Sequence, residues 1–142
     1  SGGGYTLGLK GDNIHEYARI IGLMDDYEAL THERKRRRRY LPYDAIKIII
    51  ESKKGQFDKK LLKILLRKIS VFPLNNYVEL NTGEIGVVTD TTEEKTLRPT
   101  IKLLYDSKKN KLDTGIVISL EENPFLYIVK SVYEEDIEKK SE

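Results

Sequence analysis

The sequence predicts an α+β protein in which a three-helix segment precedes a small, barrel-like module of five strands. Apolar residues follow a helical period from about residue 13 to residue 70, and Pro73 marks a change to the alternating pattern of β-strands. Five short strands at this spacing favour a small, strongly bent sheet or barrel. We therefore expect a helical unit at 1–70, a β module at 71–133 and a frayed acidic tail at 134–142.

Three helices are predicted, each with an identifiable start. Asn13 is a suitable N-cap for a helix that runs to about residue 30. Pro42 fits the first turn of a second helix at 43–54, and Asp58 can cap a third that runs to about residue 70. Helical projection of the first helix places five apolar side chains on its core-facing side, namely Tyr17, Ile20, Ile21, Met24 and Tyr27.

The second half contains five alternating segments bounded by turn residues. Asn81, Thr82 and Gly83 form a tight hairpin signal, and Gly86 indicates a bulge in the strand that follows. The β module has no clustered His, Asp or Ser, so we expect no catalysis from it. The predicted strands cover residues 77–80, 84–89, 100–105, 115–120 and 125–132.

Charge is distributed unevenly along the chain. The net charge is only +2, yet residues 34–39 are entirely basic and residues 134–138 are mostly acidic. This pattern argues against a globally basic nucleic-acid binder and favours a local anion site. No cysteine is present, which excludes disulfides and thiolate metal sites. No apolar run approaches the roughly 18 residues of a membrane span, and the start does not resemble a signal peptide, so we expect a cytoplasmic location.

Asp25 is the candidate metal ligand. Projection places it near Ala18, Ile21 and Ala29, on the flank of the apolar face, where an unpaired carboxylate costs several kcal/mol. A hard cation removes that cost, and so does a salt bridge to a neighbouring helix. The position of the residue leaves both interpretations open.

The candidate ligand-binding residues lie on either side of the first helix. Arg34 and Arg37 have the spacing to hold phosphate oxygens through guanidinium contacts, although a solvated connector would have the same composition. Lys10 can extend from a glycine-broken loop towards an anion, and Tyr5 can stack on a base or hydrogen-bond a phosphate.

The order of these motifs resembles the second half of an HD-GYP domain. The sequence G-Y-x-x-G-L-K-G-D-x-I at residues 4–14 is followed by A-R-I-I-G-L-x-D-x-Y-x-A-L-T at 18–31 and R-x-x-R at 34–37. The likeness covers about residues 2–70, and the β module resembles, more loosely, an extension that follows some HD-GYP domains. Gly4, Tyr5 and Thr6 match the signature loop, with threonine in place of its proline.

The resemblance implies a bacterial, metal-dependent phosphodiesterase that hydrolyses cyclic di-GMP. It implies Asp25 as a metal ligand, and Tyr5, Lys10, Arg34 and Arg37 as ligand-binding residues. Such domains hold iron or manganese, and a metal-bound hydroxide attacks phosphorus to give pGpG and sometimes GMP.

The other metal ligands of this family precede the signature loop, so we expect the chain to be a C-terminal fragment that is inactive alone. We also expect it to self-associate through exposed helix faces. The alternative is a non-catalytic regulatory module that binds a nucleotide or a protein partner.

Overall fold

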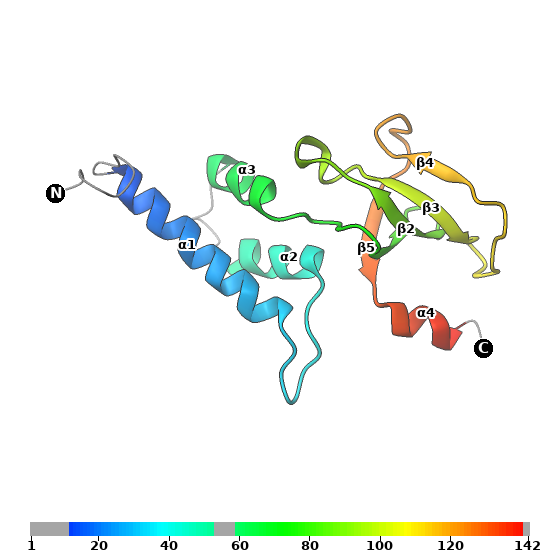
Figure 1. The fold of residues 1–142 in the computed structure, drawn as a ribbon, viewed down its shortest axis with the longest axis horizontal. Coiled ribbons are helices and arrows are strands. Elements are labelled where there is room, and N and C mark those ends of the chain that lie inside the picture. The colour runs from blue at the N-terminus through cyan, green and yellow to red at the C-terminus, as the bar shows by residue number, and fades with distance from the viewer. Residues whose placement is uncertain (1–11, 53–58, 141–142) are drawn as a thin grey trace.

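The computed structural model describes residues 12–52 and 59–140, which form helices followed by one sheet (Figure 1). Helices α1 (Asp12–Thr31), α2 (Pro42–Ser52) and α3 (Lys59–Lys68) confirm the predicted helical segment, with α1 packed against both α2 and α3. The expected end of the second helix at Gly55 and the expected cap at Asp58 lie outside the described residues.

The five predicted strands form one antiparallel sheet in the order β4-β3-β2-β1-β5. The sheet has two free edges, β4 and β5, so the barrel-like closure expected from strand spacing is wrong for the described residues. A short 3₁₀ helix, η1 (Glu93–Lys95), connects β2 to β3. The strands are β1 (Tyr77–Leu80), β2 (Ile85–Asp90), β3 (Thr100–Tyr105), β4 (Val117–Ser119) and β5 (Ile128–Val132).

The turn between β1 and β2 follows the sequence signal closely. The Gly83 amide donates to the carbonyl oxygen of Leu80 at 2.8 Å, and the Leu80 amide donates to that of Glu84 at 2.8 Å. Gly83 has φ 91°, a conformation that glycine adopts without steric cost. The hairpin predicted at residues 81–83 is therefore confirmed.

Helices and sheet share one hydrophobic core, and the linker between α3 and β1 contributes Val71 and Phe72 to it. Phe72, between α3 and β1, is 2% exposed and stacks on Tyr43 of α2 with ring centroids 5.3 Å apart. The Val71 amide donates to the buried hydroxyl of Thr96, which anchors the same linker beside η1. The buried cluster contains Leu23, Ile46, Ile49, Leu61, Leu65, Ile69, Val71, Phe72, Val78, Leu80, Val88, Ile101, Leu103 and Leu120.

The acidic segment after β5 is ordered, so the frayed tail expected there is wrong. It forms helix α4 (Glu134–Lys140), which lies beside the sheet (Figure 1). Ile137 is only 6% exposed and anchors α4, and Glu135 and Asp136 at its start both contact Arg38. A single buried apolar residue together with those ion pairs gives the segment the fixed contacts that its composition alone does not predict.

Two apolar residues of α1 also differ from their expected position. Leu23 is buried, and Ile20, Met24 and Tyr27 pack against the core as half-buried residues. Tyr17 is 45% exposed and Ile21 is 44% exposed, so both lie on a side of the helix that no other described element covers. The projection was correct for Ile20, Met24 and Tyr27, but it missed Leu23, and the helix buries a face that is rotated away from Tyr17 and Ile21.

Gly86 lies at the register shift between Ile85 and Gly86, as the bulge prediction requires. An added Cβ there would lie 2.8 Å from the backbone oxygen of Lys102, which cannot move without distorting β3. We therefore expect Gly86→Ala to lower the free energy of unfolding by about 2 kcal/mol, measured by urea denaturation. Gly22→Ala is the matched control, because its Cβ meets nothing within 4 Å and should stabilise α1 by about 1 kcal/mol. Equal effects of the two substitutions would contradict the packing argument.

Candidate functional site

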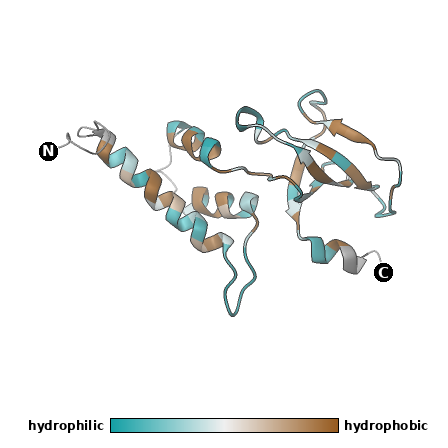
Figure 2. Cartoon of the chain, viewed as in Figure 1, coloured by the Kyte–Doolittle hydropathy of each residue, from teal (hydrophilic) through white to brown (hydrophobic). Residues whose placement is uncertain are grey.

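The basic segment between α1 and α2 forms a tight β-hairpin. The Arg34 amide donates to the carbonyl oxygen of Arg37 at 3.0 Å, and the Arg37 amide donates back to that of Arg34 at 3.2 Å. Lys35 and Arg36 occupy the tip, and the whole connection is hydrophilic (Figure 2). Pairing across the hairpin places Arg34 directly opposite Arg37, so the structure brings these two predicted ligand-binding residues together.

The hairpin also closes the C-terminus of α1. A helix end leaves four carbonyl groups without intrahelical partners. The Thr31 hydroxyl donates to the Tyr27 carbonyl oxygen at 3.0 Å, His32 Nδ1 lies 2.7 Å from that of Glu28, and the Tyr40 amide donates to that of Leu30 at 2.9 Å. Local donors thus meet the carbonyl oxygens of Glu28 and Leu30 in the last turn of α1.

Arg37 completes this cap from outside the helix. Its Nη1 donates to the carbonyl oxygens of Leu30 at 3.3 Å and Arg38 at 3.2 Å, and Nη2 donates to that of Ala29 at 3.5 Å. The guanidinium also lies 4.5 Å from the ring centroid of Tyr40. A cation at this point faces the negative end of the helix dipole. A ligand-binding role for Arg37 stays a prediction, and an anion would meet a guanidinium that is already held in place.

Replacing Arg37 with methionine tests its capping role. The substitution keeps the length of the side chain but removes its hydrogen bonds and its charge, so we expect the free energy of unfolding to fall by about 1–2 kcal/mol in urea. Arg36→Met removes the neighbouring exposed charge at the hairpin tip and should change it by less than about 0.5 kcal/mol. A loss that is the same for both variants would assign the effect to net charge and contradict the capping role.

The other basic side chains divide into two groups. Arg38 contacts Glu135 and Asp136 of α4, and Arg39 lies 3.7 Å from Glu33. The hydrogen bond from Arg38 to Asp136 is the main reason that the pKa of Arg38 is raised. In contrast, the exposed side chains of Arg34, Lys35 and Arg36 form no ion pair within the described residues. These three cations are the part of the hairpin that is available to an anionic ligand.

Asp25 lies on the uncovered side of α1, and its side chain is exposed. The expectation that the described chain buries this carboxylate is therefore wrong. Exposed residues around it are mostly small or apolar, including Ala18, Ile21, Gly22 and Ala29. The result is an uncovered strip along α1 that carries two carboxylates, Asp25, about 9 Å along the helix axis from Thr31, and Glu28, which is exposed one turn further on. Its role as a metal ligand stays a prediction.

The described residues hold no group of three or more His, Asp or Glu side chains that could bind a metal ion. Asp25 has the chemistry of a hard-cation ligand, but one carboxylate does not make a metal centre. The remaining predicted site residues, Gly4, Tyr5, Thr6 and Lys10, lie outside the described part of the chain. None of the helices in that part is long and apolar enough to cross a membrane.

Sequence reasoning missed the contact between the basic hairpin and α4. Tyr133 and Asp136, together with Arg38, form this contact across a separation of more than 90 residues. A signal was present, because the one strongly basic and the one strongly acidic segment of the chain complement each other in charge. Composition could not show that the fold brings them together.

Two family models match the chain, one over most of the helical part and the other over the sheet and α4. Residues 1–61 match the model of the HD domain, and residues 77–140 match that of the KOW domain associated with the HD domain. The chain thus has an HD-domain segment followed by an HD-associated KOW domain. The HD segment (residues 1–61) contains α1, the basic hairpin and α2, and the KOW domain (residues 77–140) contains the sheet and α4.

The chain is distantly similar in sequence to curated cyclic di-GMP phosphodiesterases. A cyclic di-GMP phosphodiesterase of Pseudomonas aeruginosa is 27% identical over 107 residues, or 75% of this chain, and one of Borreliella burgdorferi is 31% identical over 108 residues, or 76% of it. A probable cyclic di-GMP phosphodiesterase of Vibrio cholerae is 37% identical over 65 residues, 46% of this chain and 15% of that protein. The chain spans 26% and 28% of the length of the first two. No solved structure matches it significantly.

Proposed function

We propose that this HD-domain protein serves in a metal-dependent phosphodiesterase that hydrolyses cyclic di-GMP to pGpG or GMP. In this proposal Asp25 supplies one metal ligand, and Arg34 and Arg37 bind the phosphates or guanines of the nucleotide. Homology to cyclic di-GMP phosphodiesterases supports the substrate class. HD domains generally bind divalent metals, and iron or manganese is the metal we expect here.

The observation that carries the proposal is the uncovered strip on α1. Its small residues allow another helix to approach closely, and it carries Asp25 together with a second exposed carboxylate, Glu28, one turn further on. A Cβ added at Gly22 would meet no atom within 4 Å, so the middle of the strip is open. A metal centre here would take its further ligands from parts of the HD domain outside the described residues. A packed helix would then bury Asp25 as the sequence pattern predicts.

The basic hairpin supports the nucleotide-binding half of the proposal. Arg34, Lys35 and Arg36 form no ion pair with the part of the chain that the structure describes, and they begin three residues after the end of α1, the helix that carries Asp25. Guanidinium groups bind phosphate oxygens through two parallel hydrogen bonds, which suits a cyclic dinucleotide with two phosphodiester groups. A metal ligand and an anion-binding loop are thus arranged along one helix.

The test uses the protein with a complete HD domain, purified with Mn²⁺ or with Fe²⁺ under anaerobic conditions. Metal content is measured by mass spectrometry, and cyclic di-GMP turnover by anion-exchange chromatography of the nucleotides. We expect at least two metal ions per protein and accumulation of pGpG or GMP. A fully metallated protein that leaves cyclic di-GMP intact would overturn the proposal.

A second candidate function, protein interaction by the KOW domain, is favoured by one exposed aromatic. Phe125 is 89% exposed, yet its carbonyl oxygen accepts a hydrogen bond from Asn81 Nδ2 at 3.2 Å, and Asn81 also bonds both backbone groups of Tyr127. Such a fixed backbone presents Phe125 to solvent.

Self-association through Tyr17 and Ile21 is a related prediction, and light scattering coupled to size-exclusion chromatography tests it. Dimers that persist in Ile21→Ser but not in Phe125→Ser would assign the contact to the KOW domain.

A further inference from the structure

The basic hairpin is held by the start of α4, in the KOW domain. The guanidinium of Arg38 lies 3.4 Å from the ring centroid of Tyr133, and its Nη2 donates to Asp136 Oδ2 at 3.1 Å. A second carboxylate, that of Glu135, lies 3.9 Å from Nη1 of the same guanidinium. One arginine side chain is therefore fixed by an aromatic face and by two carboxylates.

The same tyrosine also holds the hairpin backbone. The Tyr133 hydroxyl donates to the carbonyl oxygen of Arg39 at 2.6 Å. Because this bond involves the main chain, it fixes the position of the returning hairpin strand and not only one long side chain. Arg38 and Arg39 directly follow Arg37, which pairs with Arg34 across the hairpin.

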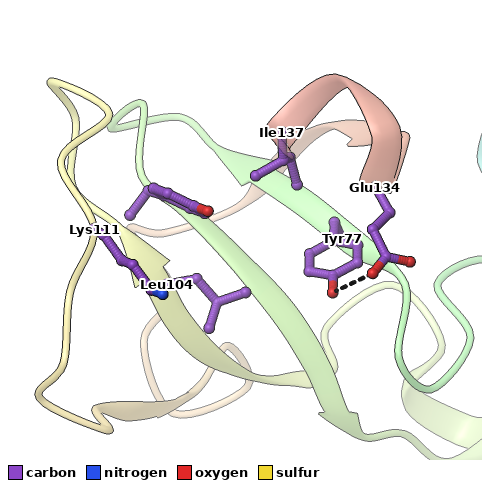
Figure 3. Close-up of a pocket in the computed structure, with 6 residues that line it drawn as sticks. Tyr77, Leu104, Lys111, Glu134 and Ile137 are labelled. Carbon is purple, nitrogen blue, oxygen red and sulfur yellow. Dashed lines mark hydrogen bonds between the residues drawn. The ribbon is translucent and has the colours of Figure 1, made fainter. Parts of the chain in front are cut away.

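The sheet fixes α4 in turn. Tyr133 directly follows Val132, the last residue of β5, which pairs with Tyr77 of β1. Ile137 points from α4 towards the sheet, and the Tyr77 hydroxyl donates to Glu134 Oε1 at 3.4 Å (Figure 3). These residues line a cavity of about 140 Å³ between α4 and the sheet. The start of α4 is thus anchored to the sheet of the KOW domain by contacts that do not involve the hairpin.

We propose that Tyr133 and Asp136 are positioning residues for nucleotide binding, through which the KOW domain sets the geometry of the Arg34–Arg37 hairpin. This inference rests on the proposed function for its substrate, but its structural part stands by itself. Without this contact, the returning strand would keep its pairing with Arg34, the cap made by Arg37, the hydrogen bond of the Tyr40 amide and the exposed ion pair between Arg39 and Glu33. A loop fixed before binding loses less conformational entropy when the ligand arrives, so it binds more tightly.

The chemistry of the contact predicts its response to salt. Arg38 is 51% exposed and Asp136 is 39% exposed, so the ion pair is screened at high ionic strength. The hydrogen bond from Tyr133 to a neutral carbonyl group is less sensitive to salt. Hence the aromatic residue makes the main contribution and the carboxylate a smaller one.

The first experiment measures hydrogen exchange in the 142-residue chain. In Tyr133→Leu we expect the amides of Arg37 and Tyr40 to exchange about tenfold faster, because both the ring and the hydroxyl are lost. Tyr133→Phe keeps the ring and should give an intermediate change. Tyr127→Leu, at an exposed tyrosine elsewhere in the KOW domain, is the matched control and should leave both amides unchanged. Unchanged exchange of these two amides in Tyr133→Leu would overturn the inference, independently of any result on cyclic di-GMP hydrolysis.

The second experiment measures cyclic di-GMP hydrolysis in the protein with a complete HD domain. We expect Tyr133→Leu to raise KM about tenfold with kcat changed less than about twofold, because the residue positions a binding loop and touches no reacting atom. Asp136→Asn should raise KM less, and 0.5 M salt should abolish the difference between Asp136→Asn and the unmodified protein. An equal loss of kcat, or an unchanged KM, would contradict the positioning role. Absence of hydrolysis in the unmodified protein would overturn the proposed function instead, and hydrogen exchange would still decide the structural part.

Discussion

Replacing Asp25 with asparagine is expected to lower cyclic di-GMP hydrolysis at least about 100-fold in the protein with a complete HD domain. Asparagine keeps the shape of the side chain and one oxygen, but it lacks the negative charge that a divalent metal prefers in its ligand. The metal content of the purified protein should fall in parallel. Both quantities are measured on the same preparation, by nucleotide chromatography and by mass spectrometry of the metal.

Two comparisons separate loss of a ligand from loss of structure. In the chain described here Asp25 is exposed, so Asp25→Asn should change the free energy of unfolding by less than about 0.5 kcal/mol. Asp26→Asn, one residue along α1, is the matched control and should keep both the metal and the activity. A variant at Asp25 that keeps full activity and metal would remove this residue from the site.

Replacing Phe72 with alanine is expected to have the largest effect on stability, a loss of about 3–5 kcal/mol. The side chain is almost fully buried, stacks on Tyr43 of α2, and belongs to the core that helices and sheet share. Its removal leaves a cavity at the junction of the two parts. Because a domain of this size is stabilised by only about 5–15 kcal/mol in total, the variant should lose a large part of its stability and unfold at a much lower temperature.

Phe125→Ala removes the same side chain from a position that is 89% exposed, and it should change stability by less than about 0.5 kcal/mol. Unfolding of both variants is followed by circular dichroism for the helices and by methyl resonances of Val78 and Ile101 for the sheet. We expect the two signals to change together in Phe72→Ala, since both parts contribute to one core. Separate transitions would instead support independent units at 1–70 and 71–133, as the sequence pattern predicts.

Local pattern was sufficient for the first three helices and the five strands, but not for α4. The 3.6-residue period, Pro42 and the residues around Gly83 predicted helices and turns that the structure confirms to within a few residues. These features are encoded by neighbouring residues, because capping, turn geometry and side-chain alternation act over a few positions. The same local encoding allowed the family resemblance to be read from the motifs around α1 and the hairpin.

Closure of the sheet could not be read in this way. Strand spacing favoured a barrel, but the hydrogen bonds between strands leave β4 and β5 as edges in the described residues. Closure depends on twist and on which strands meet, and a list of strands contains neither. Gly86 was the one local clue to irregular pairing, and the register shift beside it confirms that clue.

The sequence by itself determined the order of the elements, the apolar arc of α1, and the presence of Asp25 and a dense basic segment beside it. Only the tertiary structure decided which part of that arc is covered, that Arg37 caps a helix, and that the acidic residues after β5 form a helix bound to Arg38. The reason is the range of the interactions involved. Periodicity and capping act between residues a few positions apart, whereas burial and charge pairing depend on segments that only folding brings together.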